Sequence, residues 1–169
     1  MKKIKLIVCC DADYGIGVDN SLPWNIPEDM KIFRKKTIGD KHNCVIMGRN
    51  TCESIPSKYF PLSNRHNCIL SSIHPENLHE NVSVYRNKED LFSWIDSSSF
   101  RDYWIIGGKM IYDLFLQNQR VSEIHMSILQ KKYKCDTFFD KSILKEFKEQ
   151  EAVLHEPHGF IHKIFVKDL

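Results

Sequence analysis

The chain has 169 residues, of which 42% are hydrophobic and 27% charged, a composition typical of globular proteins. At this length we expect one domain, residues 1–169, with a sizeable core. A formal net charge of +2 gives no reason to expect a nucleic acid or another acidic polymer as a partner.

The first half of the chain alternates apolar runs with loops and one helical pattern. An unbroken apolar run predicts a buried strand over residues 5–10. Residues 11–27 are too irregular for a regular element, and a loop of this length is often functional. Pro27 and the acids that follow it suit the first turn of a helix over residues 28–37. Further on we expect a strand at 44–47, a turn and short helix at 48–55, a loop at 57–67 and a strand at 67–70.

The second half continues the alternation of strands and helices. After a connection that begins at His74-Pro75, we expect strands at 82–85, 103–106 and 121–128, and helices at 88–97 and 109–116. A helix-free C-terminal part then predicts antiparallel strands at 147–153 and 160–166. The pattern as a whole predicts an α/β fold, a mixed, mostly parallel twisted sheet of about eight strands flanked by about four helices.

Cysteine and charge patterns suggest a compartment. The first apolar run is cut short by Asp11 and Asp13, so we expect no signal peptide, and no stretch reaches the length of a membrane span. Six cysteines without a C-x-x-C pair indicate free thiols in a reducing cytoplasm. Eight scattered histidines show no metal-ligand spacing, so no metal site is expected.

Asp29 is the strongest candidate for chemistry. Asp29, Ile32 and Phe33 are spaced to share one helix face, with Met30 expected beside them. An acid on an apolar face is costly to bury without a partner, and its pKa should be raised. The plain alternative is a first-turn acid that favours the helix dipole, as Glu28 does. The apolar neighbours of Asp29 favour the functional interpretation.

A pair of glycines at a strand-to-helix junction suits a phosphate. Gly107 and Gly108 would let backbone N–H groups approach a phosphate at a helix N-terminus. Lys109 follows them, so the full G-x-G-x-x-G pattern is missing, and the dipeptide alone favours a plain tight turn.

A second junction of the same kind contains Gly48, Arg49, Asn50 and Thr51. Arg49 offers a charged fork for an anion. The alternative makes Thr51 a helix cap and Arg49 a solvated side chain. Two such junctions in one sheet favour a split phosphate site, to which the hydroxyls of Ser71-Ser72 at another strand end could contribute.

Five blocks of the sequence resemble the dihydrofolate reductase family, in the order and at the spacing of that family. The resemblance extends over almost the full length of the chain. The blocks are I-G-V-D-N-S-L-P-W-N-I-P-E-D (16–29), V-I-M-G-R-N-T-C-E-S-I (45–55), N-R-H-N-C-I-L-S-S (64–72), I-I-G-G-K-M-I-Y (105–112) and C-D-T-F-F (135–139).

The resemblance implies reduction of 7,8-dihydrofolate to tetrahydrofolate, with hydride passing from NADPH C4 to pterin C6 and a proton reaching N5. Asp29 matches the acid of the pterin pocket, and Trp24 and Leu22 belong to a mobile loop that closes over the site. The substrate would further contact Ile7, Val8, Cys9, Met30, Phe33, Ile55, Leu62, Arg65, Ile106, Tyr112 and Ser127, with Arg65 matching the arginine that pairs with the glutamate α-carboxylate.

The resemblance also implies NADPH as the cofactor. Gly107 and Gly108 would wrap the pyrophosphate, with Arg49 and Ser71 near the 2′-phosphate. The other implied contacts are Cys9, Ile16, Gly17, Asn20, Leu22, Gly48, Asn50, Thr51, Leu70, Ser72, Ile106, Lys109, Met110, Ile111 and Tyr112. Most members of the family are monomers, and the same is expected here.

Some positions depart from common family patterns. Lys109 replaces a small residue after the double glycine, Cys52 replaces a frequent aromatic, and Ser127 replaces threonine. Cys9 and Met30 line the implied pocket, so antifolate affinity is expected to differ from that of other members.

Two other functions were weighed. A related reductase with a pterin-like or pyrimidine substrate fits the fold, but Trp24, Asp29 and Arg65 together match a pterin that bears a glutamate tail. A non-catalytic nucleotide-binding module is disfavoured, because the acid, the loop and the glycine turns all match the family pattern.

Overall fold

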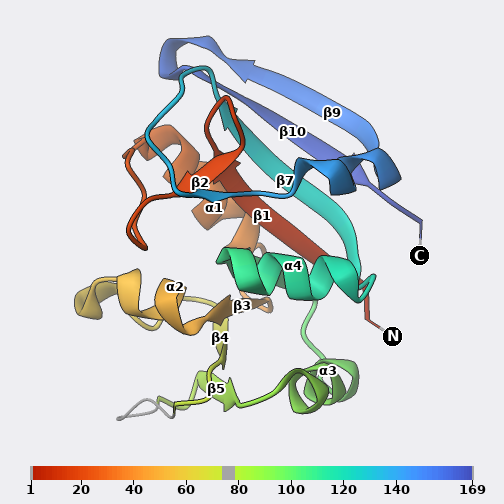
Figure 1. Cartoon of the computed structure of the whole chain (residues 1–169). Helices are drawn as coiled ribbons and strands as arrows, with labels where there is room; N and C mark the ends of the chain where they lie inside the picture. The colour runs from red at the N-terminus through yellow and green to blue at the C-terminus, as the bar shows by residue number, and fades with distance from the viewer. Residues whose placement is uncertain (1, 74–78, 169) are drawn as a thin grey trace.

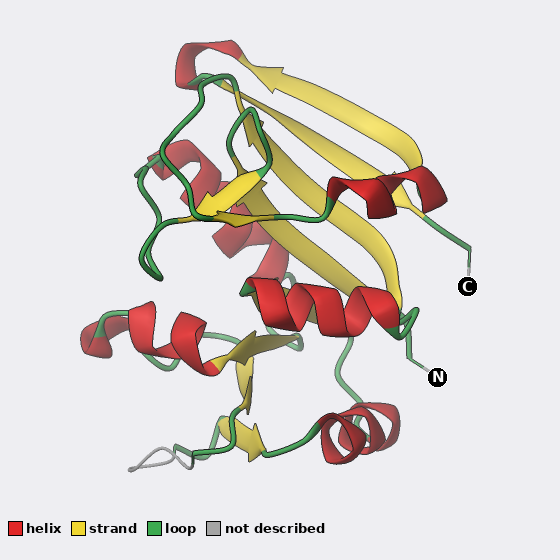
Figure 2. Cartoon of the chain, in the orientation of Figure 1, coloured by secondary structure: helices red, strands yellow, loops and turns green. Residues whose placement is uncertain are grey.

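The computed structural model describes residues 2–73 and 79–168. Its main feature is a twisted eight-stranded sheet in the order β5-β4-β3-β6-β1-β7-β10-β9, accompanied by a two-stranded sheet of β2 and β8. β10 runs antiparallel to both of its neighbours, whereas the other pairs are parallel. The mostly parallel α/β fold with an antiparallel C-terminal edge is therefore confirmed (Figures 1 and 2).

The elements follow the predicted alternation closely. The strands are β1 (Ile4–Cys10), β2 (Gly15–Gly17), β3 (Cys44–Gly48), β4 (His66–Leu70), β5 (Val82–Tyr85), β6 (Tyr103–Gly107), β7 (Val121–Leu129), β8 (Thr137–Phe138), β9 (Lys148–His155) and β10 (Phe160–Val166). The helices are α1 (Pro27–Ile38), α2 (Arg49–Ser54), α3 (Lys88–Ser97) and α4 (Lys109–Gln117), with short 3₁₀ turns at Ser57–Tyr59, Lys141–Glu146 and Glu156–His158.

Local sequence explains where the helices begin and end. Pro27 opens α1, acids occupy its first turn and lysines its last, and Gly39 ends it with a positive φ of 52°. The Asn87 side chain caps α3 by accepting a hydrogen bond from the backbone N–H of Asp90. These features were readable from the sequence, and the predicted boundaries of both helices lie within one residue of the observed ones.

Two expectations about loops were wrong. Residues 11–27 contain β2, which pairs antiparallel with β8, more than a hundred residues away. The C-terminal part also contains two 3₁₀ turns rather than being free of helix. Neither feature has an apolar periodicity, because β2 and β8 are joined by backbone pairing rather than by core burial. His74-Pro75 lies outside the described residues.

The sheet separates two apolar layers. On one face, α3 and α4 pack over alternate residues of the central strands, including Leu6, Val8 and Ile105. On the other face, Ile7, Val45 and neighbouring residues pack with Phe33 of α1 and Cys52 of α2. Figure 1 shows this arrangement, with α4 in front of the sheet and α1 behind β1. Cys9 and Cys10, as expected of neighbours in a strand, therefore face opposite layers.

All six cysteines, which lie within the described residues, are free. Among residues 2–73 and 79–168, no helix is long and apolar enough to cross a membrane.

Candidate active site

Several of the predicted site residues lie at the carboxyl ends of the parallel strands. β1 ends beside Cys9, β3 ends at Gly48, β4 at Leu70 and β6 at Gly107. Ligands of open α/β sheets bind at this end of the strands. Residues from four separate strands therefore share one edge of the sheet.

Asp29 lies in the first turn of α1 and faces β1 and β7. Burial raises the pKa of its carboxyl, and hydrogen bonding from Ser127 and Cys9 only partly opposes this effect. The raised pKa expected from the sequence is confirmed. Ser127 is paired with Cys9 across β7 and β1, so the two strands present a hydroxyl and a thiol to the same acid.

Met30 was expected among the inward-facing residues, and this was wrong. Its side chain is 51% exposed, whereas Ile32 and Phe33 are half-buried. The reason is helical geometry, because each residue is turned by about 100° from the one before it. Met30 therefore lies at the rim of the site rather than on the face of Asp29.

Cys9 is the neighbour of Asp29 on β1. Burial raises the pKa of its thiol, and the nearby Asp29 charge raises it further. The indole of Trp24 also lies against this thiol and packs edge-on against Tyr133, with 5.3 Å between ring centroids. Trp24 thus contacts both Cys9, the neighbour of Asp29, and Tyr133 in the loop at 131–135.

Two acids anchor the loop at 11–26. The buried Asp11 carboxylate accepts hydrogen bonds from the backbone N–H groups of Gly15 and Tyr133, both 2.8 Å long. Although burial disfavours its charge, these bonds lower the pKa of Asp11. Asp136 accepts from the backbone N–H of Asp19 at 3.0 Å and donates its own N–H to Gly17 at 3.0 Å. Neither anchor was identified from the sequence, because both join segments more than a hundred residues apart.

Leu22 lies in the same loop and is 53% exposed. Among the other implied residues of the loop, Asn20 is exposed with a φ of 60°, Ile16 is half-buried and Gly17 is buried. The hypothetical Cβ of an alanine at Gly15 would lie 2.6 Å from Cys135 Sγ. The loop and the 131–139 segment are therefore in close contact.

The two glycine junctions are neighbours, as the sequence predicted. Met47 of β3 is in register with Gly107 of β6, and a Cβ on Gly48 would meet Ile111 Cγ1 of α4 at 2.9 Å. Gly107 has a φ of 123° and is followed by a cis peptide to Gly108. A Cβ at Gly107 would lie 3.3 Å from both the Thr51 and Tyr112 hydroxyl oxygens. Only glycine therefore leaves space at this turn, and we call the backbone of Gly107 and Gly108 the glycine cradle.

Side chains around the junctions have defined partners. Tyr112 is buried and donates a hydrogen bond to the Ile7 carbonyl at 2.9 Å. Arg49 is exposed and forms an ion pair with Glu53 at 2.7 Å. The cap of α2 is Gly48, without a side-chain hydrogen bond, so Thr51 is not its cap. Met110 is 84% exposed.

The two serines at the end of β4 differ in orientation. The buried Ser71 hydroxyl donates to the Ile73 carbonyl at 2.8 Å and accepts from the Ile73 N–H. Ser72 is exposed. The Ser72 hydroxyl is therefore better placed than that of Ser71 to meet an anion.

Arg65 and its neighbours form the end of the site away from the glycines. Arg65 is buried, with Nε donating to the Ser63 carbonyl at 2.8 Å and Nη1 to Thr37 Oγ1 at 3.0 Å. Burial and the nearby Arg34 lower the pKa of Arg65 to about 10, so it stays charged at neutral pH. Ile55, Leu62 and Phe33 pack together in the same apolar layer. Ile106 joins that layer, and Val8 lies in the opposite one.

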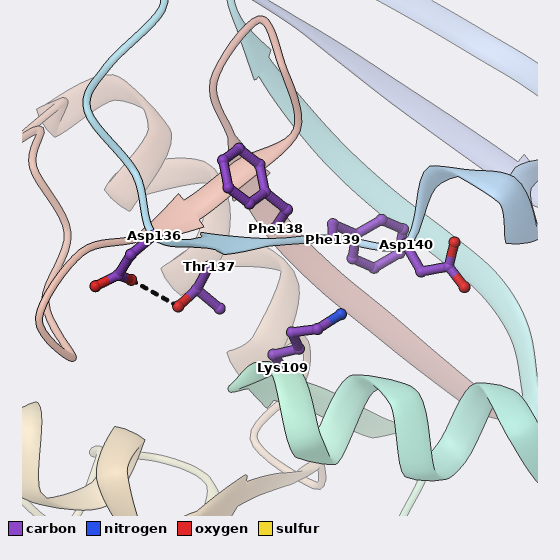
Figure 3. A pocket seen from close by; sticks show the side chains of 6 residues that line it. All are labelled: Lys109, Asp136, Thr137, Phe138, Phe139 and Asp140. Carbon is purple, nitrogen blue, oxygen red and sulfur yellow. Dashed lines mark hydrogen bonds between the residues drawn. The ribbon is translucent and has the colours of Figure 1, made fainter.

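A cavity of about 440 Å³ opens between the start of α4 and the segment that contains β8. Lys109 and residues 136–140 line it (Figure 3). Lys109 forms an ion pair with Asp113 at 3.2 Å. The cavity adjoins the glycine turn, but the predicted pterin residues do not line it. A second cavity, of about 500 Å³, involves Lys2, Lys3 and Lys167, and contains none of the predicted site residues.

Together, the parallel sheet, the acid beneath an anchored loop and the glycine cradle define an α/β enzyme with its ligand site at the strand ends. Comparisons with known proteins specify the family. The dihydrofolate reductase profile matches residues 3–162. The chain is 34% identical to a dihydrofolate reductase of Heliothis virescens, over 86% of this chain and 83% of the relative.

Two further relatives agree. A putative dihydrofolate reductase of Caenorhabditis elegans is 37% identical, over 90% of this chain and 84% of the relative. A bifunctional dihydrofolate reductase-thymidylate synthase of Paramecium tetraurelia is 34% identical, over 86% of this chain and 30% of the relative. The chain belongs to the dihydrofolate reductase family, a family of oxidoreductases.

Proposed function

We propose that this protein reduces 7,8-dihydrofolate to 5,6,7,8-tetrahydrofolate with NADPH, in support of one-carbon and thymidylate metabolism. Hydride would pass from nicotinamide C4 to pterin C6, with protonation at N5. The observation that carries the proposal is Asp29, a half-buried acid of α1 that faces β1 and β7, in a chain of this family.

Asp29 would bind and orient the pterin. An ionised carboxylate only accepts hydrogen bonds, so it pairs with the N–H donors of the pterin amino group and N3. Burial raises the pKa of Asp29, which brings proton uptake by the acid closer to neutral pH. The acid therefore favours a protonated site when hydride arrives, and N5 is the atom that receives the proton.

The loop at 11–26 would exclude water from this step. Leu22 and Trp24 belong to it, and Asp11 and Asp136 hold it against the 131–137 segment. Exclusion of water strengthens electrostatic interactions within the site and protects the transferred hydride. The exposed Leu22 side chain is expected to become covered when both ligands are bound.

Arg65 would hold the glutamate tail of the substrate. Its hydrogen bonds to Ser63 and Thr37 fix the plane of the guanidinium, and a fixed fork suits a carboxylate. Phe33, Ile55 and Leu62 would contact the p-aminobenzoyl group that connects the tail to the pterin. Met30, at the rim, would pack against the same group.

The residues at the glycine junctions fit NADPH, which supplies the hydride. The open backbone at Gly107 leaves room for a diphosphate, and α4 begins without a side-chain cap, so its first N–H groups remain available. Arg49 and Ser72 would bind the 2′-phosphate. Tyr112 and Ile106 would lie near the nicotinamide.

We further propose that the protein acts as a cytoplasmic monomer. The free cysteines suit a reducing compartment.

The test follows the absorbance of NADPH with purified protein in the presence and absence of dihydrofolate. We expect consumption of NADPH that depends on dihydrofolate and yields tetrahydrofolate in equal amount. Asp29→Asn should lower turnover near neutral pH by at least about 100-fold, as expected for loss of an acid–base group, while NADPH binding is retained. Dihydrofolate-independent consumption, or near-normal turnover of Asp29→Asn, would refute the proposal.

A further inference from the structure

Behind Asp29 lies a buried polar pair that the family comparison does not explain. Ser127 of β7 is in register with His162 of β10, and Ser127 Oγ lies 2.8 Å from His162 Nδ1. The two residues are 1% and 7% exposed. On its other side Ser127 is paired with Cys9 of β1. Ser127 therefore lies between the histidine and the strand that borders the acid.

The surroundings keep the His162 ring neutral. Burial lowers the pKa of His162 to about 3, and the charges of Lys36, His125 and His155 act in the same direction. These groups come from α1, β7 and β9, the elements around the ring. A neutral imidazole carries one N–H, so the hydrogen bond with Ser127 has two possible directions.

The buried second nitrogen of His162 decides between these directions. Within residues 2–73 and 79–168, Nε2 has no hydrogen-bond partner in the protein. If Nε2 carried the proton, a buried N–H donor would be left unpaired, which is costly. With the proton on Nδ1, His162 donates to Ser127 Oγ, and the Ser127 hydroxyl proton is free to point elsewhere.

Asp29, on the α1 face of the sheet beside Ser127 and Cys9, is the acid that this hydroxyl proton can be directed at. Among the groups that lower the pKa of Asp29, Ser127 has the largest effect, followed by Cys9 and then His155. A hydroxyl that donated to His162 could not donate to Asp29, because it has only one proton. The two observations agree on one direction, from imidazole to hydroxyl to carboxylate.

The adjacent histidine has no such role. Lys36 Nζ lies 2.8 Å from His125 Nδ1, and an ammonium group only donates, so His125 Nδ1 must accept. The remaining nitrogen of His125 faces Glu123 at 3.9 Å. His125 is thus hydrogen-bonded to Lys36, and its Nε2 faces the Glu123 carboxylate beyond hydrogen-bond distance. Of the two histidines, only His162 is hydrogen-bonded to Ser127.

We propose that His162 is a positioning residue, which donates from Nδ1 to Ser127 and thereby directs the Ser127 hydroxyl proton at Asp29. Its catalytic consequence rests on the proposed function, whereas the hydrogen-bond chain is a property of the free protein. Without His162, the serine hydroxyl can rotate away, and the Asp29 carboxylate loses its main neutral donor. The pKa of Asp29 then rises further.

The test is a titration of the Asp29 carboxyl by ¹³C NMR in the free protein, with the signal assigned from its absence in Asp29→Asn. We compare His162→Leu, His162→Gln and His162→Asn. The Asn amide reaches the position of Nδ1 and can donate to Ser127, whereas the Gln amide reaches the position of Nε2. We expect Leu and Gln to raise the pKa of Asp29 by about one unit and Asn to leave it within about a third of that. If His162→Leu does not fold, His162→Gln still provides a variant without a donor at the position of Nδ1.

A second series identifies the route of the effect. Ser127→Ala should raise the pKa of Asp29 by a similar amount, and His162→Gln should add nothing in the Ser127→Ala background. An unchanged pKa in both His162→Leu and His162→Gln, an equal rise in His162→Asn, or a full additional rise in the double variant would overturn the proposal. The first result would show that His162 does not affect the pKa of Asp29. Either of the other two results would show that His162 does not act through Ser127.

The catalytic consequence has its own measurement. The limb of the pH–rate profile that Asp29→Asn abolishes should move to higher pH in His162→Gln and remain in place in His162→Asn. A merely structural role would lower the rate without moving that limb. The NMR titration needs no substrate or cofactor, so a protein that fails to reduce dihydrofolate but shows the expected titration would refute only the proposed function.

Discussion

Asp29, the acid of the proposed reaction, lowers the stability of the folded protein at neutral pH. Burial raises the pKa of its carboxyl in the folded protein, so the unfolded chain ionises more readily than the folded one. The resulting loss of stability develops as pH rises from the ordinary value of 3.8 through the raised folded-state pKa, and it is complete above that range.

Asp29→Asn should therefore increase the free energy of unfolding at pH 7. The asparagine keeps the shape of the side chain but cannot ionise. The gain should shrink towards pH 3, where aspartate is largely protonated in both states. Urea unfolding at several pH values measures this gain. Asp168→Asn, which removes the same charge from an exposed residue, controls for net charge. A variant less stable than the parent at pH 7 would contradict this interpretation.

Arg49 determines preference for the phosphorylated cofactor in this account. In the free protein it forms an exposed ion pair with Glu53 at 2.7 Å, a pair that contributes little to stability. Arg49→Ala should reduce the preference for NADPH over NADH by roughly 10- to 100-fold, as loss of charged hydrogen bonds to a phosphate implies. The ratio of kcat/KM for the two cofactors measures this effect.

Glu53→Gln is the matched control for Arg49→Ala. It breaks the same ion pair but keeps the arginine, so the preference for NADPH should be retained or increased. If Arg49→Ala left the preference unchanged, Arg49 would have no part in binding the 2′-phosphate.

At the scale of elements, the loop at 11–26 is held by the segment around β8 as well as by the core contacts of Tyr14 and Ile16. Asp136 forms two hydrogen bonds to this loop, with the backbones of Gly17 and Asp19, and the Asp19 bond lowers the pKa of its carboxyl. Asp136→Ala removes the charged acceptor of the hydrogen bond from the Asp19 N–H. The hydride-transfer step should slow by about tenfold.

Global stability should change little in Asp136→Ala, because the residue is exposed and contacts a loop. Single-turnover kinetics and urea unfolding separate the two effects. Asp140→Ala is a suitable control, since Asp140 lies on the same segment but hydrogen-bonds only locally, to Ser142. Equal slowing in both variants would show that the anchor at Asp19 has no specific role.

Element boundaries could be predicted because each is set by local chemistry. Pro27, Asn87 and the glycines after β3 and β6 are end signals that act within a few residues. Register across the sheet could not be predicted in this way. The pairing of Ser127 with His162 and the hydrogen bond from the Tyr133 N–H to Asp11 depend on which distant segments meet. A single sequence does not state that.

For the site, the face of Asp29 followed from helix spacing, whereas its substrate came from resemblance to a family. Ser71 shows the limit of both approaches. Its position at a strand end suggested an anion contact, but its hydroxyl is bound to Ile73. Met30 shows the same limit, because the rotation of one residue moves it from the buried face to the rim.

At the scale of the whole molecule, buried histidines make the fold sensitive to acid. The pKa values of His66, His125 and His162 are lowered from 6.5, mainly by burial. The neutral histidines cost the folded protein no stability above pH 6.5. As pH falls below that value, the unfolded chain binds protons at these rings and the folded chain does not, so the free energy of unfolding decreases. Each histidine contributes a slope of up to about 1.4 kcal/mol per pH unit.

The free energy of unfolding should thus decrease between pH 7 and pH 5, before carboxylates such as Glu123, with a pKa lowered to about 2, begin to titrate. Urea unfolding across this range tests the expectation. His162→Asn should flatten the slope, since it removes one of the three groups. A free energy that is constant between pH 7 and pH 5 would contradict the neutral state assigned to these rings.

In the proposed reaction, the half-buried Asp29 of α1 and the glycine turn between β6 and α4 serve one hydride transfer. The most direct measurement uses NADPH with deuterium at both C4 positions and locates the label in the tetrahydrofolate formed, by NMR. We predict one deuterium at pterin C6 in the wild-type product, N5 protonated from solvent, and at least about a 100-fold slower appearance of label with Asp29→Asn. A product without deuterium at C6, or an equal rate with Asp29→Asn, would contradict the account.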